Sequence, residues 1–129
     1  MIPCILAHDL GTSGNKASLF DFNGKLIGST VVSYSVYYPR RGWAEERPED
    51  WWNAVCQATK SVLEMVPDAE VSTVAVTGQM MGCLALDKEG KTLGNSIIWS
   101  DSRAEAESER LVRQLTKEGY QKITGQPPS

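Results

Sequence analysis

Short apolar runs separated by turn residues open the chain. Residues 4–8 form one such run and end at a glycine-rich turn, which is typical of a buried strand. Residues 16–21 alternate between apolar and polar, and residues 26–35 are rich in valine, threonine and serine. Asn23 and Gly24 stand between these two runs, and this dipeptide predicts a hairpin turn in which both central residues have positive φ. The chain is therefore expected to begin with consecutive antiparallel strands.

A helix is predicted to begin at Pro48 and to stop before Pro67. Proline suits the first helical position, and Glu49 and Asp50 place negative charge near the positive end of the helix dipole. Apolar residues then recur at spacings of three and four, which gives one apolar stripe that must be buried. The residues of this stripe are Trp51, Val55, Ala58, Val62 and Val66.

Three shorter strands are expected after this helix. Residues 71–77 are apolar and β-branched, and we expect them to form a central strand. Residues 82–87 and 96–99 are further strand candidates, separated by a turn at Lys88-Glu89-Gly90-Lys91. A helix between two strands that share one sheet indicates an α/β domain with a mixed sheet.

A second helix is predicted over residues 102–117. Ser102 and Glu105 have the spacing of a capping box, in which each side chain bonds the free amide of the other residue. Gly119 suits the position that ends a helix. Residues 125–129 are expected to be coil.

The composition excludes several functional classes. The 129 residues are enough for one compact domain, and 41% of them are apolar. The net charge of −3 provides no basic surface for nucleic acid, and no apolar run approaches the roughly 18 residues of a membrane span. The first ten residues lack the basic region of a signal peptide. We therefore expect no nucleic-acid and no membrane partner.

The cysteines indicate a reducing compartment. There are three, an odd number without a Cys-x-x-Cys spacing, so neither a disulfide framework nor a zinc site is expected. A cytoplasmic location follows as the expectation.

The segment from Asp9 to Lys16 carries residues suited to binding phosphate. It joins two predicted strands, so it is neither a Walker loop nor a dinucleotide fingerprint, both of which need a helix after the turn. Gly11 and Gly14 can let the backbone approach an anion, hydroxyl groups follow at residues 12 and 13, and the lysine supplies positive charge. The same residue types also make ordinary hairpin turns, and on the turn alone both interpretations stay open.

Four segments together carry a family resemblance. Asp-x-Gly-Thr-Ser-x-x-Lys at residues 9–16 is similar to the first phosphate motif of the actin, Hsp70 and sugar kinase superfamily. Residues 42–52 (GWAEERPEDWW), 76–82 (VTGQMMG) and 97–104 (IIWSDSRA) resemble stretches of the FGGY family of carbohydrate kinases, most closely its xylulose kinases. The resemblance implies an α/β fold of the ribonuclease-H-like class, with a mixed sheet and flanking helices.

The resemblance also implies a function and its site residues. The family phosphorylates a sugar, ketose or polyol with ATP and Mg²⁺, so the expected partner is a small sugar or polyol. The residues expected to face the ATP phosphates are Asp9, Gly11, Thr12, Ser13 and Lys16, with Asp9 also holding the metal ion through water. The residues expected to line the substrate are Gln79, Met80, Met81, Trp99, Asp101 and Arg103.

Plainer roles stay open for several of these residues. Asp101 stands where a helix N-cap belongs, and Arg103 can instead form a salt bridge at the helix start. His8 is a lone histidine in a strand, which more often packs than catalyses. The tryptophans outside residue 99 are expected in the core or at its edge; they are Trp43, Trp51 and Trp52.

The xylulose kinase pattern is not matched throughout. It has histidine where this chain has Met81, and a methionine cannot donate or accept a strong hydrogen bond. Another ketose, a polyol or a sugar acid therefore stays open as the substrate.

Members of this family have two domains, and residues 1–129 resemble only part of the first. The family's catalytic base is an aspartate in a Gly-Asp context, and that dipeptide does not occur here. We therefore expect no catalytic residue and no second domain within these residues, no activity from them alone, and association of copies through the incomplete domain surface. The alternative function is a non-catalytic nucleotide-binding or interaction module of the same superfamily. The observation that would best separate a sugar kinase from a non-catalytic module is whether the reading frame continues past Ser129.

Overall fold

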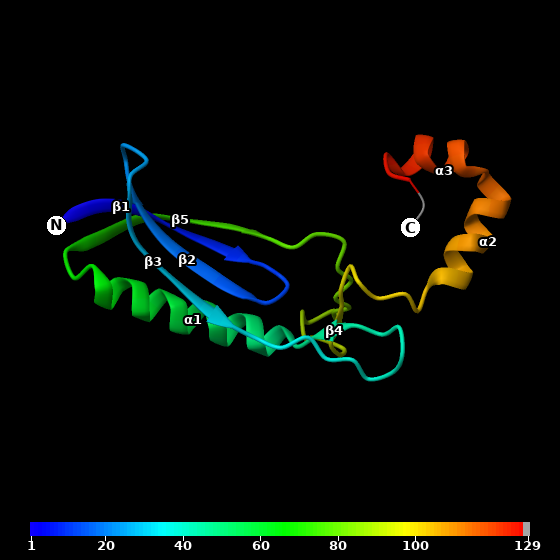
Figure 1. The fold of residues 1–129 in the computed structure, drawn as a ribbon, viewed down its shortest axis with the longest axis horizontal. Coiled ribbons are helices and arrows are strands. Elements are labelled where there is room, and N and C mark those ends of the chain that lie inside the picture. Colours follow the sequence, from blue (N-terminus) through cyan, green and yellow to red (C-terminus); the bar gives the residue numbers. More distant parts are fainter. Residues whose placement is uncertain (128–129) are drawn as a thin grey trace.

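The computed structural model describes residues 1–127, and its main feature is a four-stranded mixed sheet (Figure 1). The strands are β1 (Ile2–Leu10), β2 (Gly14–Asp21), β3 (Leu26–Ser33) and β5 (Ala69–Gly78). Their order is β3-β2-β1-β5; β1 pairs antiparallel with β2, which pairs antiparallel with β3, and β5 runs parallel to β1. The predicted opening by consecutive antiparallel strands is confirmed.

The turn between β2 and β3 differs from the prediction. Gly24 has φ 80°, but Asn23 is not among the positive-φ residues. The Asp21 carboxylate accepts hydrogen bonds from the backbone N–H groups of Asn23 and Lys25, both at 2.9 Å, and the Asp21 N–H donates to the Lys25 carbonyl. Because this side chain holds the turn, only the glycine needs the left-handed conformation.

One helix covers one face of the sheet. Helix α1 (Pro48–Met65) begins at the predicted proline and lies along β2 and β3, below the sheet in Figure 1. Its buried Ala58 and Val62 pack with the side chains that the strands direct to this face, which are Cys4, Leu6, Ala17 and Leu19. Trp52 is 68% exposed, so the expectation that it belongs to the core or its edge is wrong. It directly follows Trp51 and therefore lies away from the sheet-facing stripe.

The opposite face of the sheet, and strand β5 on both faces, are open. Val74 and Val76 are 58% and 69% exposed, because α1 lies over β2 and β3 and does not reach them. The expectation of a central strand at residues 71–77 is therefore wrong for the described residues, in which β5 is the edge strand.

A small second sheet lies beyond the carboxyl ends of β1 and β5. Strands β4 (Glu45–Glu46) and β6 (Ser96–Ile97) pair antiparallel. Residues 82–87, predicted as a strand, form only isolated bridges, from Cys83 to Ile97 and from Leu86 to Thr92. Each bridge joins a single pair of residues, so the segment lacks the continuous neighbour that would extend it into a strand.

The predicted second helix is divided in two. Helices α2 (Glu105–Leu115) and α3 (Lys117–Thr124) form a hairpin at one end of the molecule, with no buried residue in either helix (Figure 1). Thr116 separates them at φ 60°, and its hydroxyl accepts a hydrogen bond from the N–H of Gly119 at 3.2 Å. Gly119 therefore lies inside α3, and Gly125 at φ 75° ends it.

The predicted capping box is also absent. Ser102 donates its hydroxyl hydrogen bond to the carbonyl of Gly42 at 3.1 Å, and α2 begins later, with no side-chain cap. The serine is used to fix the preceding loop instead. No helix within residues 1–127 is long and apolar enough to cross a membrane.

Candidate functional site

A tight turn at residues 11–13 connects β1 and β2. Asp9 near the end of β1 lies opposite Lys16 near the start of β2, both exposed on the sheet face that α1 leaves open. This confirms that the predicted phosphate segment joins two antiparallel strands.

The turn is braced by its own backbone and by Tyr34. The Gly11 N–H donates to the Gly14 carbonyl at 3.0 Å, and the Tyr34 hydroxyl donates to the Gly11 carbonyl. A Cβ atom on Gly14 would lie 2.7 Å from the carbonyl oxygen of Val32, so this glycine is required by close packing against β3. At Gly11 the same atom would meet nothing closer than 3.6 Å, which leaves room above the turn.

Several hydrogen-bond donors of the turn have no partner within residues 1–127. They are the backbone N–H groups of Thr12 and Ser13 and the Ser13 hydroxyl. The ammonium of Lys16 forms no ion pair there either. Open N–H groups beside a free positive charge fit an anion.

A chain of hydrogen bonds joins this turn to two distant segments. The Trp99 indole donates to the Thr12 hydroxyl at 2.9 Å, and that hydroxyl donates to the Gln79 side-chain oxygen at 3.2 Å. The Gln79 amide nitrogen donates to Glu46 Oε2 at 2.7 Å, and the Trp51 indole donates to the same oxygen at 2.6 Å. We call these five side chains the relay. It brings three of the predicted site residues together.

Glu46 is the member of the relay that sequence reasoning missed. Its side chain is fully buried, and Oε1 has no hydrogen-bond partner among the described residues. Burial raises the pKa of this carboxyl above its ordinary value, although the hydrogen bonds from Trp51 and Gln79 act to lower it. In the sequence it stands in a charged Glu-Glu-Arg run, which indicates a solvated surface, so no local signal identifies it.

Burial also affects the tyrosine that braces the turn. It raises the pKa of Tyr34 to about 12, with smaller contributions from the negative charges of Glu46 and Asp9. Tyr34 therefore stays protonated and able to donate to the turn at neutral pH.

Three apolar side chains stand exposed beside the relay. Met80, Met81 and Trp99 are 75%, 67% and 55% exposed. Met81 has φ 62°, a left-handed conformation that L residues with side chains adopt at a cost. Trp99 contacts the turn through Thr12, whereas Met80 and Met81 follow Gln79 along the chain. That these three side chains line a substrate stays a prediction.

Asp101 and Arg103 form their own cluster. The guanidinium of Arg103 binds both carboxylate oxygens of Asp101 at 2.8–3.0 Å and Glu45 at 2.7 Å, and it lies 3.8 Å from the ring centre of Trp43. Asp101 also accepts from the backbone N–H of Ala44 at 2.6 Å. These bonds, chiefly those from Arg103, lower the pKa of Asp101 to about 2. The cluster fixes the loop that carries Trp99.

The histidine of β1 has a packing role. His8 is 3% exposed and lies within hydrogen-bonding distance of Asn15 and of Thr59 on α1, at 3.0 and 3.2 Å. It lies on the helix-covered face, away from Asp9 and Lys16. The prediction that His8 packs in the fold is confirmed.

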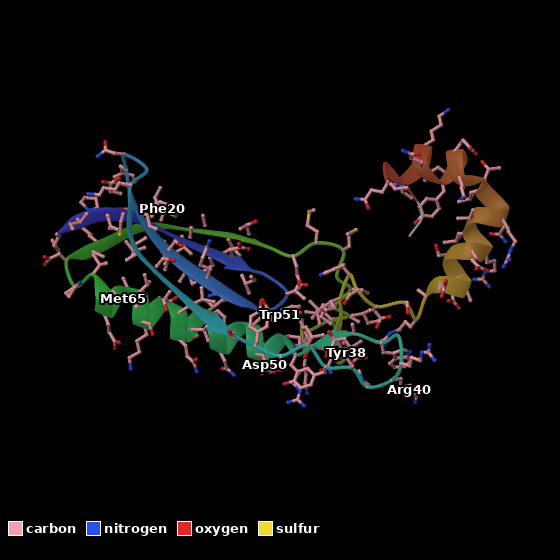
Figure 2. The ribbon with its side chains drawn as sticks, in the orientation of Figure 1. Phe20, Tyr38, Arg40, Asp50, Trp51 and Met65 are labelled. Atoms are coloured by element: carbon pink, nitrogen blue, oxygen red, sulfur yellow. The ribbon has the colours of Figure 1, made fainter. Side chains whose placement is uncertain are left out.

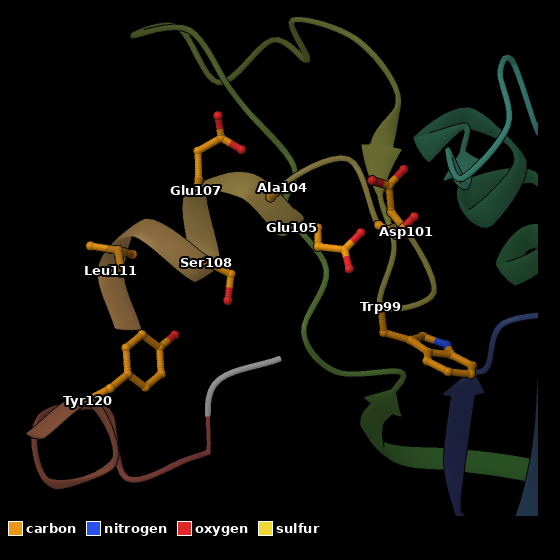
Figure 3. Close-up of a pocket in the computed structure, with 9 residues that line it drawn as sticks. Trp99, Asp101, Ala104, Glu105, Glu107, Ser108, Leu111 and Tyr120 are labelled. Carbon is orange, nitrogen blue, oxygen red and sulfur yellow. The ribbon is translucent and has the colours of Figure 1, made fainter. Parts of the chain in front are cut away.

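Three hollows lie beside the candidate site, and one of them, of about 290 Å³, is lined by Trp51, Gln79 and Met81 among others. The other two lie to either side. The smaller of these two, of about 200 Å³, lies on the open sheet face and is lined by Asp9, Lys16 and Thr77 among others. A larger one, of about 540 Å³, lies between Trp99 and the α2–α3 hairpin, with Leu111 and Tyr120 on its far side (Figure 3). Within residues 1–127 no group of three or more histidine, cysteine or acidic side chains is placed to hold a metal ion.

Residues 4–129 match the FGGY family of carbohydrate kinases, N-terminal domain. The chain is 37% identical over 118 residues to a glycerol kinase of Rippkaea orientalis, covering 89% of this chain and 23% of that protein. It is 30% identical over 127 residues to a gluconokinase of Bacillus licheniformis, covering 98% of this chain and 25% of that protein. A crystal structure of a xyloylose kinase from Brucella ovis superposes with a TM-score of 0.89 at 31% identity, covering 95% of this chain and 26% of that one. The chain thus spans about a quarter of the length of these relatives.

Proposed function

Because the chain belongs to the FGGY family of carbohydrate kinases, we propose that it supplies the ATP-phosphate turn and one wall of the sugar site of an enzyme that phosphorylates a sugar, ketose or polyol. The observation that carries this proposal is the contact between the turn and the substrate-side loops. Thr12 meets Gln79 and Trp99, which are 67 and 87 residues away in the sequence. Phosphoryl transfer depends mostly on positioning and charge stabilisation, and both require the phosphate and the acceptor hydroxyl to be adjacent.

On the phosphate side, we assign ATP contacts to Asp9, Gly11, Thr12, Ser13 and Lys16. Support comes from the open N–H groups of Thr12 and Ser13 and from the space above Gly11. The Thr12 hydroxyl is already engaged by Gln79 and Trp99, so this residue contributes its backbone N–H. Lys16 supplies positive charge to the phosphates.

The acidic group of this side is suited to magnesium. Mg²⁺ keeps several waters and needs only one or two carboxylates besides the substrate phosphates, which agrees with a single exposed carboxylate at Asp9. When bound, Mg·ATP supplies the phosphoryl group and neutralises part of its charge. The role of Asp9 is to orient the water shell of the ion.

On the substrate side, Met80, Met81 and Trp99 provide exposed apolar surface for the C–H face of a polyol. Gln79 is held at the edge of this surface by Thr12 and Glu46. Asp101 and Arg103 support the site by fixing the Trp99 loop, and the guanidinium remains available at its edge, with a side chain 21% exposed.

The named relatives act on three types of substrate, and their percentages of sequence identity to this chain are too similar to favour one of them. They are a gluconokinase, glycerol kinases and xylulose kinases. Met81 cannot hydrogen-bond a hydroxyl strongly, so we assign it to recognising carbon rather than oxygen atoms.

We propose that residues 1–129 form part of an N-terminal kinase domain and that the catalytic base lies outside them. Two carboxylates beside the substrate-side loops are unsuited to taking the proton of an acceptor hydroxyl, since Glu46 is buried and Asp101 is bound by Arg103. Asp9 is assigned to the metal ion. These residues alone are therefore expected to show no turnover.

The test is ATP-dependent phosphorylation by the product of the complete reading frame, beside residues 1–129 alone. The substrates are gluconate, glycerol and xylulose, with product detected directly. We expect turnover of at least one substrate by the former and of none by the latter. Binding of ATP by both without any phosphorylation would instead favour a non-catalytic nucleotide-binding module.

A further inference from the structure

A buried carboxyl group stands at one end of the relay without a counter-ion. Glu46 is fully buried, and no described residue forms a salt bridge with it; Arg103 pairs with the neighbouring Glu45 instead. One carboxylate oxygen accepts from Trp51 and Gln79, and the other accepts nothing. Burying an acidic group in this way is costly, so the group needs a role that a neutral residue would not perform.

The chemistry of the side chains in the relay decides which group donates and which accepts in each of its hydrogen bonds. An indole N–H can only donate, and an ionised carboxylate can only accept. Gln79 must therefore turn its NH₂ group toward Glu46 and its oxygen toward Thr12. The Thr12 hydroxyl proton is then committed to Gln79, which leaves the hydroxyl oxygen to accept from Trp99.

We propose that Glu46 is a positioning residue that sets the direction of the relay and thereby holds the Thr12 turn and the Trp99 loop in one arrangement. A neutral glutamine in its place could donate or accept, which would allow the Gln79 amide to turn over. The Thr12 hydroxyl would then accept from Gln79, and its bond from Trp99 would have a competitor. Figure 2 shows Trp51, the far end of the relay, at the end of α1 nearest β4.

The protonation of Glu46 should therefore change the chemical shifts of the indole N–H groups of both Trp51 and Trp99. Hydrogen bonds to an ionised acceptor are roughly twice as strong as those to a neutral one, and hydrogen bonds in a chain polarise one another. Burial moves the titration of Glu46 above the ordinary range of a glutamate. Among the titratable or charged groups around it are Tyr34, whose pKa is about 12, and its chain neighbours Glu45 and Arg47. Glu45 is paired with Arg103.

The experiment is a pH titration of the ¹⁵N-labelled chain, following the indole N–H resonances of Trp51 and Trp99 from about pH 8 to about pH 4, with circular dichroism confirming the fold. Both resonances should shift with one midpoint, above that of exposed glutamates, and the shift should be smaller at Trp99, three hydrogen bonds from the carboxyl. No nucleotide or sugar is present. The result therefore tests the relay alone. Only the assignment of a phosphate side and a substrate side to the relay rests on the proposed function.

Four variants identify the titrating group and its connection to Trp99. Glu46→Gln should abolish both shifts, while Glu64→Gln, an exposed glutamate of α1, and Asp9→Asn should leave them in place. Thr12→Val cuts the relay at its centre, so Trp51 should still titrate and Trp99 should not; this variant decides the question even if Glu46→Gln fails to fold. A Trp99 resonance that is indifferent to pH in the unaltered chain, or that still titrates in Thr12→Val, would overturn the proposal.

Discussion

At the scale of single residues, two carboxyl groups near the candidate site are in opposite electrostatic situations. Asp101 is held by Arg103 and by the Ala44 N–H, and its pKa is lowered to about 2. Glu46 is buried without a counter-ion, and its pKa is raised. Acid should therefore weaken the contribution of the first to stability and strengthen that of the second.

Asp101→Asn should lower the free energy of unfolding by roughly 1.5–3 kcal/mol at neutral pH, the contribution typical of hydrogen bonds to charged groups. Because the folded-state pKa is depressed, this contribution is complete above the ordinary value of 3.8 and is lost as the pH falls toward about 2. Urea unfolding at several pH values measures it. Asp68→Asn, an exposed aspartate without a side-chain partner among the described residues, is the control, and equal losses in both variants would contradict the assignment.

Glu46→Gln should make the stability of the chain less dependent on pH between about 4 and 8. A raised folded-state pKa means that Glu46 favours the folded state most at low pH and loses this contribution as the pH rises through its folded value. The difference in unfolding free energy between the variant and the unaltered chain should therefore shift in favour of the variant as pH rises. A difference that is constant over this range would show that Glu46 does not titrate there.

At the scale of elements, the segments with local signals were predicted and those fixed by distant partners were not. Pro48 and the acids after it begin α1 as predicted, since helix starts are encoded in neighbouring residues. The division of the last helix depends on Thr116 at φ 60°, a conformation that β-branched residues rarely adopt and that no pattern indicates.

The candidate site divides in the same way. The turn at residues 9–16 and the loops at Gln79 and Trp99 were predicted as site segments from a family resemblance. The structure joins them through Thr12, and their binding roles stay predictions. The place of Glu46 follows from contacts with residues on other elements, which no pattern within residues 42–52 reveals.

Met81→Gly should stabilise the chain by about 0.5–1 kcal/mol. Met81 is 67% exposed and holds φ 62°, so glycine removes a strained conformation and sacrifices little packing. Thermal unfolding provides the measurement. Met80→Gly is the matched control, because Met80 is 75% exposed without positive φ, and it should leave stability unchanged or lower it. A stabilisation of the same size in both variants would mean that the backbone at Met81 is not strained.

At the scale of the whole molecule, the described residues form a sheet with cover on only one face. Strand β5 exposes Val74 and Val76 at the edge of the sheet, and the α2–α3 hairpin lies away from it (Figure 1). An exposed apolar edge strand promotes association. We therefore expect residues 1–129 on their own to be oligomeric or only marginally stable.

Val76→Lys should reduce this association, since charge on an edge strand opposes pairing. Sedimentation velocity of the two proteins at equal concentration measures the effect. Leu93→Lys is the control, because Leu93 lies outside the strands at 68% exposure, close to the 69% of Val76. A clean, stable monomer for the unaltered chain would refute the expectation.

The central claim is that the β1–β2 turn binds the phosphates of ATP beside the substrate-side loops. The measurement that tests it most directly is a titration of the ¹⁵N-labelled chain with Mg·ATP to about 10 mM, enough to detect a Kd of order 1 mM. We predict shifts centred on the amides of Thr12 and Ser13 and on the Trp99 indole, weakened in Lys16→Ala and unchanged in Lys25→Ala, an exposed lysine of the next turn. No shift at the turn, or equal shifts in Lys16→Ala and the unaltered chain, would contradict the account.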